Sequence, residues 1–241
     1  MDETFWSYKG RIVLGDQIKN EDNQFAVFSE QGTAASHLMA ARFLDAIARM
    51  PGMGGQDADA TGAYTQTELG PDCPPTWIEL PKNRWPKSWW IDKEKETPKY
   101  EKPMVRLIRN LYGHPLAGLY WLEYCDAAIK RCGCKPIKGW ECLYFHPTLG
   151  IVLSVYVDDF KCAGMKSNLL KIWQMLTDPK LGNLHLDPPQ DLVDNVYLGT
   201  KQTMCQLPES LINDKHALYK TLFERSVDQK KVKQSQSKAA T

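Results

Sequence analysis

The feature that most constrains this fold is an apolar run that ends on two adjacent aspartates. The run is IVLSVYVDDF (151–160). Because side chains alternate along a strand, Ile151, Leu153 and Val155 should share one face, which needs a core to cover it. The segment HPTLG before the run and the aspartates after it are turn sequences. Residues 142–164 are therefore predicted to form consecutive antiparallel strands.

The adjacent carboxylates of Asp158 and Asp159 need something that offsets their repulsion. Two carboxylates about 4 Å apart repel by about 4 kcal/mol at an effective dielectric constant near 20. Water would suffice for a surface turn, since aspartate is a common turn residue. A divalent cation is the alternative, because Mg²⁺ binds a few carboxylate oxygens and leaves other positions for water and phosphate.

A second acidic segment, QDADATGAY (56–64), favours the metal interpretation. Asp57 and Asp59 lie two residues apart and so on the same face of a strand. If this strand end lies beside Asp158, three carboxylates surround one point. Such a cluster can hold a pair of metals for in-line phosphoryl transfer, as in a polymerase or a nuclease. A nuclease is disfavoured, because the nearest histidine, His146, falls at the far end of the hairpin.

The composition of the chain limits the class of protein to which it can belong. The chain has 241 residues, 43% of them hydrophobic and 24% charged, as in an average globular protein. It lacks an apolar run of about 18 residues and a secretory signal, so we expect an intracellular protein with no membrane partner. The net charge is only +1, so any nucleic-acid contact must be local. Cys132, Cys134 and Cys142 lack zinc-knuckle spacing and are expected to be buried thiols near a helix end.

The periodicity predicts an α+β fold with an antiparallel sheet covered by helices on one face. Helices are expected over 32–50, 115–133, 166–178 and 207–227, and strands over 10–14, the start of 56–64, TWIEL in 75–80 and 194–202. Thr33 or Ser36 is expected to cap the first helix. Its apolar face would comprise Leu38, Ala41, Phe43, Leu44, Ile47 and Met50, and that of the third helix Leu169, Leu170, Trp173 and Leu176.

The segment 70–103 is rich in proline and tryptophan and is predicted to be a long ordered loop, because proline removes backbone donors. Two roles stay open for Trp85, Trp89 and Trp90. They cover a core edge, or they stack on nucleic-acid bases.

Several motifs in this order resemble a known family. YVDD (156–159) behind an apolar strand resembles the signature of reverse transcriptases, and the surrounding blocks are similar to the enzyme of copia-type retrotransposons. In that family an aspartate stands four residues before an alanine–aromatic pair, and DATGAY repeats this pattern. The other similar blocks are YKGRIV (8–13), RLIRNLYGHPLAGLYW (106–121) and VYLG (196–199), so the resemblance spans roughly 8–202.

The resemblance implies a right-hand polymerase fold with an incomplete thumb. Fingers and palm would occupy 1–205, and a partial thumb helix with a disordered basic tail would occupy 206–241. Asp59, Asp158 and Asp159 would bind two Mg²⁺ ions, with Mn²⁺ as an alternative, and Asp57 would be a spectator. The implied activity is RNA-directed DNA synthesis, adding deoxynucleotides to a primer 3′ end.

The resemblance also assigns residues to the substrates. Tyr64 would be the steric gate against a 2′-hydroxyl, and Lys9 and Arg11 would hold the deoxynucleoside triphosphate. The primer end would rest on Tyr197, Leu198 and Gly199. The remaining motif residues are structural, namely Leu111, Tyr112, Gly113, Tyr156 and Val157. The partners would be an RNA or DNA template with its primer, with ribonuclease H and integrase parts on another chain.

Two departures from the family pattern support a competing hypothesis. Leu116 replaces a glutamine that helps hold the nucleotide, and Gly118 replaces a proline. The chain also ends soon after the expected palm. The alternative is a truncated or degenerate fragment without catalytic activity that at most binds nucleic acid. A further alternative is a non-catalytic module that binds nucleic acid through its tryptophan-rich loop.

Overall fold

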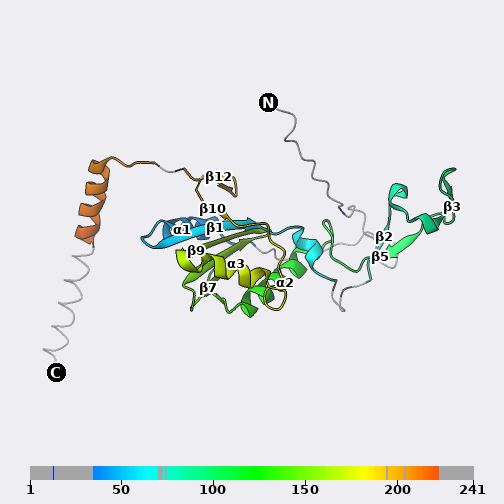
Figure 1. Cartoon of the computed structure of the whole chain (residues 1–241), viewed down its shortest axis with the longest axis horizontal. Helices are drawn as coiled ribbons and strands as arrows, with labels where there is room; N and C mark the ends of the chain where they lie inside the picture. Colours follow the sequence, from blue (N-terminus) through cyan, green and yellow to red (C-terminus); the bar gives the residue numbers. More distant parts are fainter. Residues whose placement is uncertain are drawn as a thin grey trace, which may run out of the picture. The chain divides into compact units, whose positions relative to one another are not determined.

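A six-stranded antiparallel sheet forms the centre of the fold (Figure 1). The computed structural model describes Val13, 35–69, Cys73, 75–193, 195–203 and 205–222. The strand order is β10–β1–β9–β8–β7–β6. The strands are β1 (Met53–Asp59), β6 (Lys135–Pro136), β7 (Leu143–His146), β8 (Ile151–Tyr156), β9 (Asp159–Met165) and β10 (Gln190–Asp191). The hairpins predicted over 142–164 are confirmed.

Helices cover both faces of this sheet. On one face, α2 (Ala117–Arg131) and α3 (Leu169–Thr177) share a core with Leu153 of β8 and Phe160 of β9. On the other face, α1 (Leu38–Ala48) packs Leu44 against Ala163. The prediction of one covered face is therefore wrong. It failed because the second face of β8 and β9, although less apolar, is also buried.

The predicted α1 forms, but small residues face the sheet. Ala40, Ala41 and Leu44 are buried, whereas the predicted core residues Leu38, Phe43 and Met50 are about half exposed. The close approach of the helix explains this choice, because a Cβ added to Gly55 of β1 would lie 2.8 Å from the Cβ of Ala48. At the contact between Gly55 and Ala48 there is no room for a larger side chain, whereas Leu44 fits elsewhere on the same face of the helix.

The predicted cap of α1 is also wrong. The residue that precedes the helix is His37, whose side chain makes no capping hydrogen bond. Ser36 instead shares a 2.6 Å hydrogen bond between its Oγ and that of Ser154 in β8. Thr33 lies outside the described residues.

The second and third predicted helices form with small changes. In α3, Leu169, Ile172, Trp173 and Leu176 are buried, while Leu170 is 65% exposed. Leu170 falls about 100° around the helix from its neighbour, so it leaves the core face. Helix α2 ends before Gly133, whose φ of +87° suits the predicted stop. Beyond this end, Cys132 and Cys134 are buried and not in disulfides, as predicted, whereas Cys142, predicted to be buried with them, is only half-buried.

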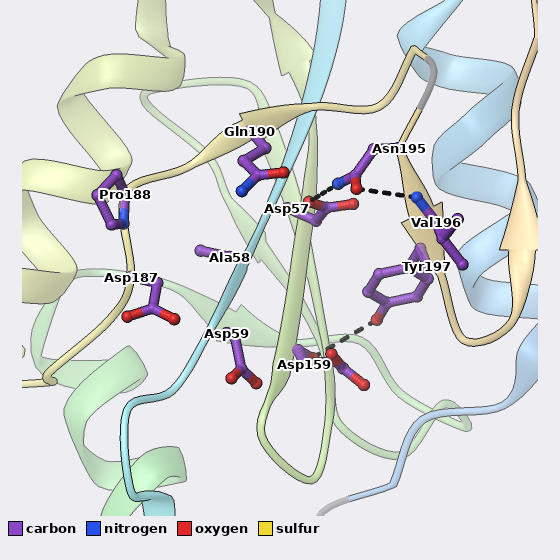
Figure 2. A pocket seen from close by; sticks show the side chains of 10 residues that line it. All are labelled: Asp57, Ala58, Asp59, Asp159, Asp187, Pro188, Gln190, Asn195, Val196 and Tyr197. Atoms are coloured by element: carbon purple, nitrogen blue, oxygen red, sulfur yellow. Dashed lines mark hydrogen bonds between the residues drawn. The ribbon is translucent and has the colours of Figure 1, made fainter. Parts of the chain in front are cut away.

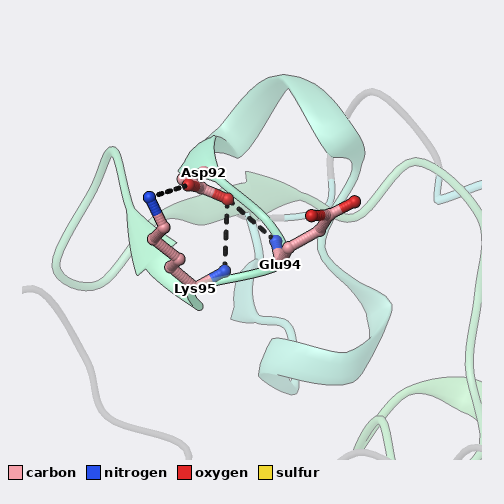
Figure 3. A network of polar contacts seen from close by, with 3 residues as sticks. All are labelled: Asp92, Glu94 and Lys95. Carbon is pink, nitrogen blue, oxygen red and sulfur yellow. Dashed lines mark hydrogen bonds and ion pairs between the residues drawn. The ribbon is translucent and has the colours of Figure 1, made fainter.

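The proline-rich segment forms its own small ribbons. β2 (Trp77–Glu79), predicted within TWIEL, pairs with β5 (Met104–Arg106). β3 (Trp90–Asp92) pairs with β4 (Thr97–Pro98). Figure 3 shows how Asp92 closes the intervening turn: one carboxylate oxygen accepts the backbone N–H groups of Glu94 and Lys95, both at 3.1 Å. The Lys95 ammonium lies 3.4 Å from the other oxygen.

The tryptophans of this segment pack on one another. Short 3₁₀ turns, η3 (Lys82–Arg84) and η4 (Lys87–Trp89), precede β3. Trp85 is buried, and its ring lies 5.8 Å from that of Trp89 and 5.4 Å from that of Trp90. Trp85 belongs to neither core cluster of the sheet. These side chains therefore form a local cluster of their own.

The last described elements differ from the expected single strand over 194–202. Two short strands, β11 (Val196–Tyr197) and β12 (Thr200–Lys201), pair with each other. Leu198 and Gly199 have φ of +46° and +74° and reverse the chain between them. Residues 209–222 are helical within the predicted 207–227. The chain forms two compact units, Met1–Thr200 and Lys201–Thr241. Among the described residues, no helix is long and apolar enough to cross a bilayer.

Trp121 should contribute strongly to stability, because it links α2 to the turn after β8. Its side chain is fully buried and its indole Nε1 donates a hydrogen bond to the carbonyl of Val157 at 2.5 Å. We expect Trp121→Phe to lower the free energy of unfolding by about 1–3 kcal/mol, through an unsatisfied carbonyl and a small cavity. Urea denaturation measures this change. Trp140→Phe is the matched control, because Trp140 is 39% exposed, and an equal loss in both variants would contradict the assigned role.

Candidate active site

The sheet brings the predicted carboxylates to one end. The register of β1 and β9 places Asp59 directly opposite Asp159. In such a pair the Cβ atoms lie about 4.5–5.5 Å apart. The backbone N–H of Ala60 donates to the carbonyl of Asp158 at 2.8 Å, which ties the aspartate turn to the end of β1. Segments about a hundred residues apart in sequence thus meet at Asp59, Asp158 and Asp159.

The turn that presents Asp158 is held in an unusual conformation. Tyr156 pairs with Asp159, so the turn residues are Val157 and Asp158, and Asp159 already belongs to β9. Val157 has φ of +57°, which β-branched residues rarely adopt. The hydrogen bonds from Trp121 and Ala60 hold this turn from two sides. Packing over-determines the conformation, as is common where strain persists near functional sites.

A pocket of about 180 Å³ opens beside Asp59 and Asp159, and Asp158 is not among its lining residues (Figure 2). Its polar lining residues are Asp57, Asp59, Asp159, Asp187, Gln190, Asn195 and Tyr197. Asp187 was not foreseen from the sequence. Its N–H donates to the carbonyl of Asp59 and its carboxylate accepts from the hydroxyl of Thr61, both at 2.8 Å. It lies on an irregular segment after α3, so no periodicity indicates its position.

Burial and mutual repulsion raise the pKa of two carboxyl groups here. Asp159 has a pKa of about 6, raised first by burial and then by the charges of Asp158 and Asp59. Asp57 also has a pKa of about 6. Burial is the main cause and Asp159 adds to it, while Lys161 and a hydrogen bond from Asn195 act in the opposite direction. The neighbouring cation and hydrogen-bond donors therefore do not fully offset the cost of ionising these carboxyl groups.

Asp57 is part of the site wall, although the sequence analysis treats it as a spectator. It is only 7% exposed, and its Oδ1 accepts a 2.6 Å hydrogen bond from Asn195. Its Oδ2 is buried with no hydrogen-bond partner in the described structure. Opposite it on β9 lies Lys161, which is 1% exposed and pairs with Asp45 of α1. The sequence pattern does not predict that Lys161 is buried, because a lysine within an apolar strand is normally taken to be exposed.

Tyr64 lies near the aspartate turn, as its predicted role requires. It belongs to η2 (Ala63–Gln66), directly after β1. Burial raises its pKa, and the nearby charge of Asp158 raises it further. Its ring centroid lies 4.9 Å from that of Tyr112, within the motif Leu111–Tyr112–Gly113.

The region of the unusual Leu116 is ordered by a histidine. His114 is 7% exposed, and its Nδ1 accepts the backbone N–H of Leu116 at 3.2 Å. Its Nε2 lies 3.3 Å from the hydroxyl of Thr76. Both ring nitrogens thus have partners within the fold, and burial lowers the pKa of this imidazole.

Of the predicted primer residues, only Tyr197 has a described contact with β9. Tyr197 is buried, and its hydroxyl lies 3.5 Å from the backbone carbonyl of Asp159, to which it can donate. Leu198 and Gly199 form the turn that follows. Lys9 and Arg11, the predicted triphosphate ligands, lie outside the described residues. Within the motif YKGRIV (8–13), the structure describes only Val13, which forms an isolated β-bridge with Tyr112.

The carboxylates suit Mg²⁺ chemically, but they do not form a closed cage. Among the described residues, no three histidine, cysteine, aspartate or glutamate side chains converge tightly enough to hold a metal ion. Mg²⁺ is commonly held by one or two carboxylates and completed by water and phosphate oxygens. The raised pKa of Asp159 shows that a nearby cation would stabilise this cluster.

Comparison with known proteins points to mobile elements. The Gag-Pol polyproteins of transposons Ty1-MR1 and Ty1-GR3 from Saccharomyces cerevisiae are each 30% identical to this chain over 86 residues. The similarity supports a retrotransposon origin. It covers 34% of this chain and only 5% of either polyprotein. No protein-family model matches the chain, and no solved structure gives a significant match.

The stability of the protein without metal should fall as the pH rises towards neutrality. The folded-state pKa of about 6 for Asp57 and Asp159 exceeds the ordinary value of 3.8, so the folded state binds more protons between these values. The free energy of unfolding therefore decreases from about pH 4 to about pH 6. Urea denaturation across this range should show a smaller decrease for Asp57→Asn. Asp92→Asn, which leaves both site carboxyls intact, should keep the wild-type slope, and an unchanged slope in Asp57→Asn would contradict the assignment.

Proposed function

We propose that this chain is the RNA-directed DNA polymerase domain of a copia-type retrotransposon. The observation that carries the proposal is the β1–β9 register, which sets Asp59 opposite Asp159 beside the turn that presents Asp158. The retrotransposon similarity and the ordered sequence motifs support the same assignment. The strained, doubly anchored turn is the kind of rigid support that a catalytic carboxylate needs.

In this proposal the primer 3′-oxygen attacks the α-phosphorus of a deoxynucleoside triphosphate, and pyrophosphate leaves. Two Mg²⁺ ions would activate the attacking oxygen and neutralise charge on the phosphates. Asp59 and Asp158 are the principal ligands and Asp159 the lesser one. Tyr64 packs where a 2′-hydroxyl would otherwise lie, and the Tyr197 strand supports the primer end.

A catalytically inactive remnant is the competing proposal, and two observations favour it. Leu116 provides an apolar side chain where the resembling family has a polar nucleotide contact. The described carboxylates also form no closed metal site. Such a chain would at most bind nucleic acid and would leave a primer unextended.

Primer extension on an RNA template separates the two proposals. We expect the purified chain to extend a DNA primer with Mg²⁺ or Mn²⁺, and Asp158→Asn to lower the rate by about 100-fold or more, since a metal supplies several kcal/mol of transition-state stabilisation. The matched control is Asp178→Asn, because Asp178 follows α3 and belongs neither to the aspartate turn nor to a strand of the sheet. A folded wild-type chain, judged by circular dichroism, that extends no primer with either metal would contradict the polymerase proposal.

Tyr64 should determine the preference for deoxynucleotides. Replacing it with alanine removes the ring that packs on Tyr112 beside the aspartate turn. We expect Tyr64→Ala to raise the use of ribonucleotides relative to deoxynucleotides by about 10- to 100-fold, the range for one steric contact. Competition between the two nucleotide types in primer extension measures the ratio. Tyr64→Phe keeps the ring and should keep the preference, and equal selectivity in all three proteins would exclude a steric gate.

A further inference from the structure

The buried ammonium of Lys161 lies at the centre of a network that the proposed chemistry does not use. Lys161 lies in β9 two residues after Asp159, so the two side chains share one face of the sheet. Its partner in the register of the neighbouring strand β1 is Asp57. From α1, the carboxylate of Asp45 forms an ion pair with its Nζ. On the remaining side, Nζ lies 4.5 Å from the centroid of the Tyr197 ring. One cation thus contacts or faces three different elements of the fold.

Strand β11 is joined to the sheet through this network. Asn195 donates to Asp57 at 2.6 Å, Tyr197 stacks over Lys161, and the Tyr197 hydroxyl lies 3.5 Å from the carbonyl of Asp159. Between them, Val196 is 58% exposed and adds little packing. Besides the burial of the Tyr197 ring, this strand therefore contacts the acidic end of the sheet through two hydrogen bonds and one cation–π contact.

The charge of Lys161 explains why these contacts hold. Asp57 has one buried oxygen without a hydrogen-bond partner, and the charge of Lys161 is the main factor that lowers the pKa of this carboxyl. A cation–π contact is strongest when the cation is removed from water, and Lys161 is 1% exposed. Together, Asp45, Asp57 and Asp159 outnumber this one cation. The pocket therefore keeps the negative charge that would attract a divalent metal.

We propose that Lys161 is a positioning residue, whose buried charge fastens strand β11 to Asp57 and to the end of β9 that carries Asp159. Its consequence for catalysis rests on the proposed function, in which the Tyr197 hairpin supports the primer end. The fastening itself does not depend on that function and can be measured without nucleotides.

Hydrogen exchange measures the fastening directly. Lys161→Met keeps the length of the side chain and removes its charge. We expect the backbone amides of Val196 and Tyr197 to exchange at least about 10-fold faster in this variant, while those of β7 stay unchanged. Lys166→Met, the same substitution at an exposed lysine just beyond β9, should match the wild type. Lys161→Arg restores the charge and should recover most of the protection.

Lys161→Met could unfold the whole sheet, and rapid exchange in β7 would reveal this. A second variant, Tyr197→Leu, then provides the test. Tyr197→Leu removes the ring face and the hydroxyl and leaves the Lys161–Asp45 pair in place, and it should accelerate exchange at residues 195–197 alone. Unchanged exchange there, in whichever of the two variants stays folded, would overturn the proposal. Equal acceleration in Lys161→Met and Lys161→Arg would overturn it as well, because charge would then be irrelevant.

The kinetic consequence is separable from the structural one. If the wild type extends primers, Lys161→Met should raise KM for the primer–template about 10-fold, with a smaller change in KM for the nucleotide. A selective rise of the nucleotide KM would contradict the placement of β11 at the primer. If the wild type extends none, the polymerase proposal fails, and the exchange result still decides the role of Lys161.

Discussion

The pairing of β1 with β9 is the interaction on which the site depends. All seven residues of β1 pair with β9, from Met53 opposite Met165 to Asp59 opposite Asp159. A shift of one residue would turn Asp57 and Asp59 to the other face and separate them from Asp159. The register is fixed by packing on both sides, because Ala58 and Phe160 lie in the core of α2 and α3 while Ala163 packs against α1. Hydrophobic burial on two faces thus sets the positions of the carboxylates.

This arrangement concentrates negative charge where water is scarce. Burial and repulsion give Asp57 and Asp159 a pKa of about 6, so their ionised forms oppose folding near neutral pH. The buried Lys161 and the hydrogen bond from Asn195 offset part of this cost. A site that keeps uncompensated acidic charge in the folded state is suited to a cation ligand. The same excess of negative charge therefore lowers the stability of the sheet and favours the binding of the metal ions in the proposed function.

The region around α2 connects the same sheet to the motifs that resemble a polymerase. Trp121 donates a hydrogen bond to the carbonyl of Val157 and so supports the turn that presents Asp158. Tyr64 and Tyr112 pack together beside that turn. His114 uses both ring nitrogens within the fold, near Leu116, and so orders the chain where the family pattern is altered. Tyr64, the residue proposed to select nucleotides, is thus held beside the aspartate turn, whereas Leu116 lies where the resembling family has a polar residue.

The sequence by itself determined the hairpins of 142–164 and the existence of the four predicted helices, because alternation, periodicity and turn residues act over a few neighbours. Long-range packing decided the rest. It turned Ala40 rather than Phe43 towards the sheet, because α1 lies close to β1. It also brought Asp187 into the pocket wall and paired the buried Lys161 with Asp45, although no local pattern marks Asp187 or Lys161. Which side chains share a pocket depends on strand order and register, and these are set by the burial of whole faces, a property that no short stretch of sequence carries.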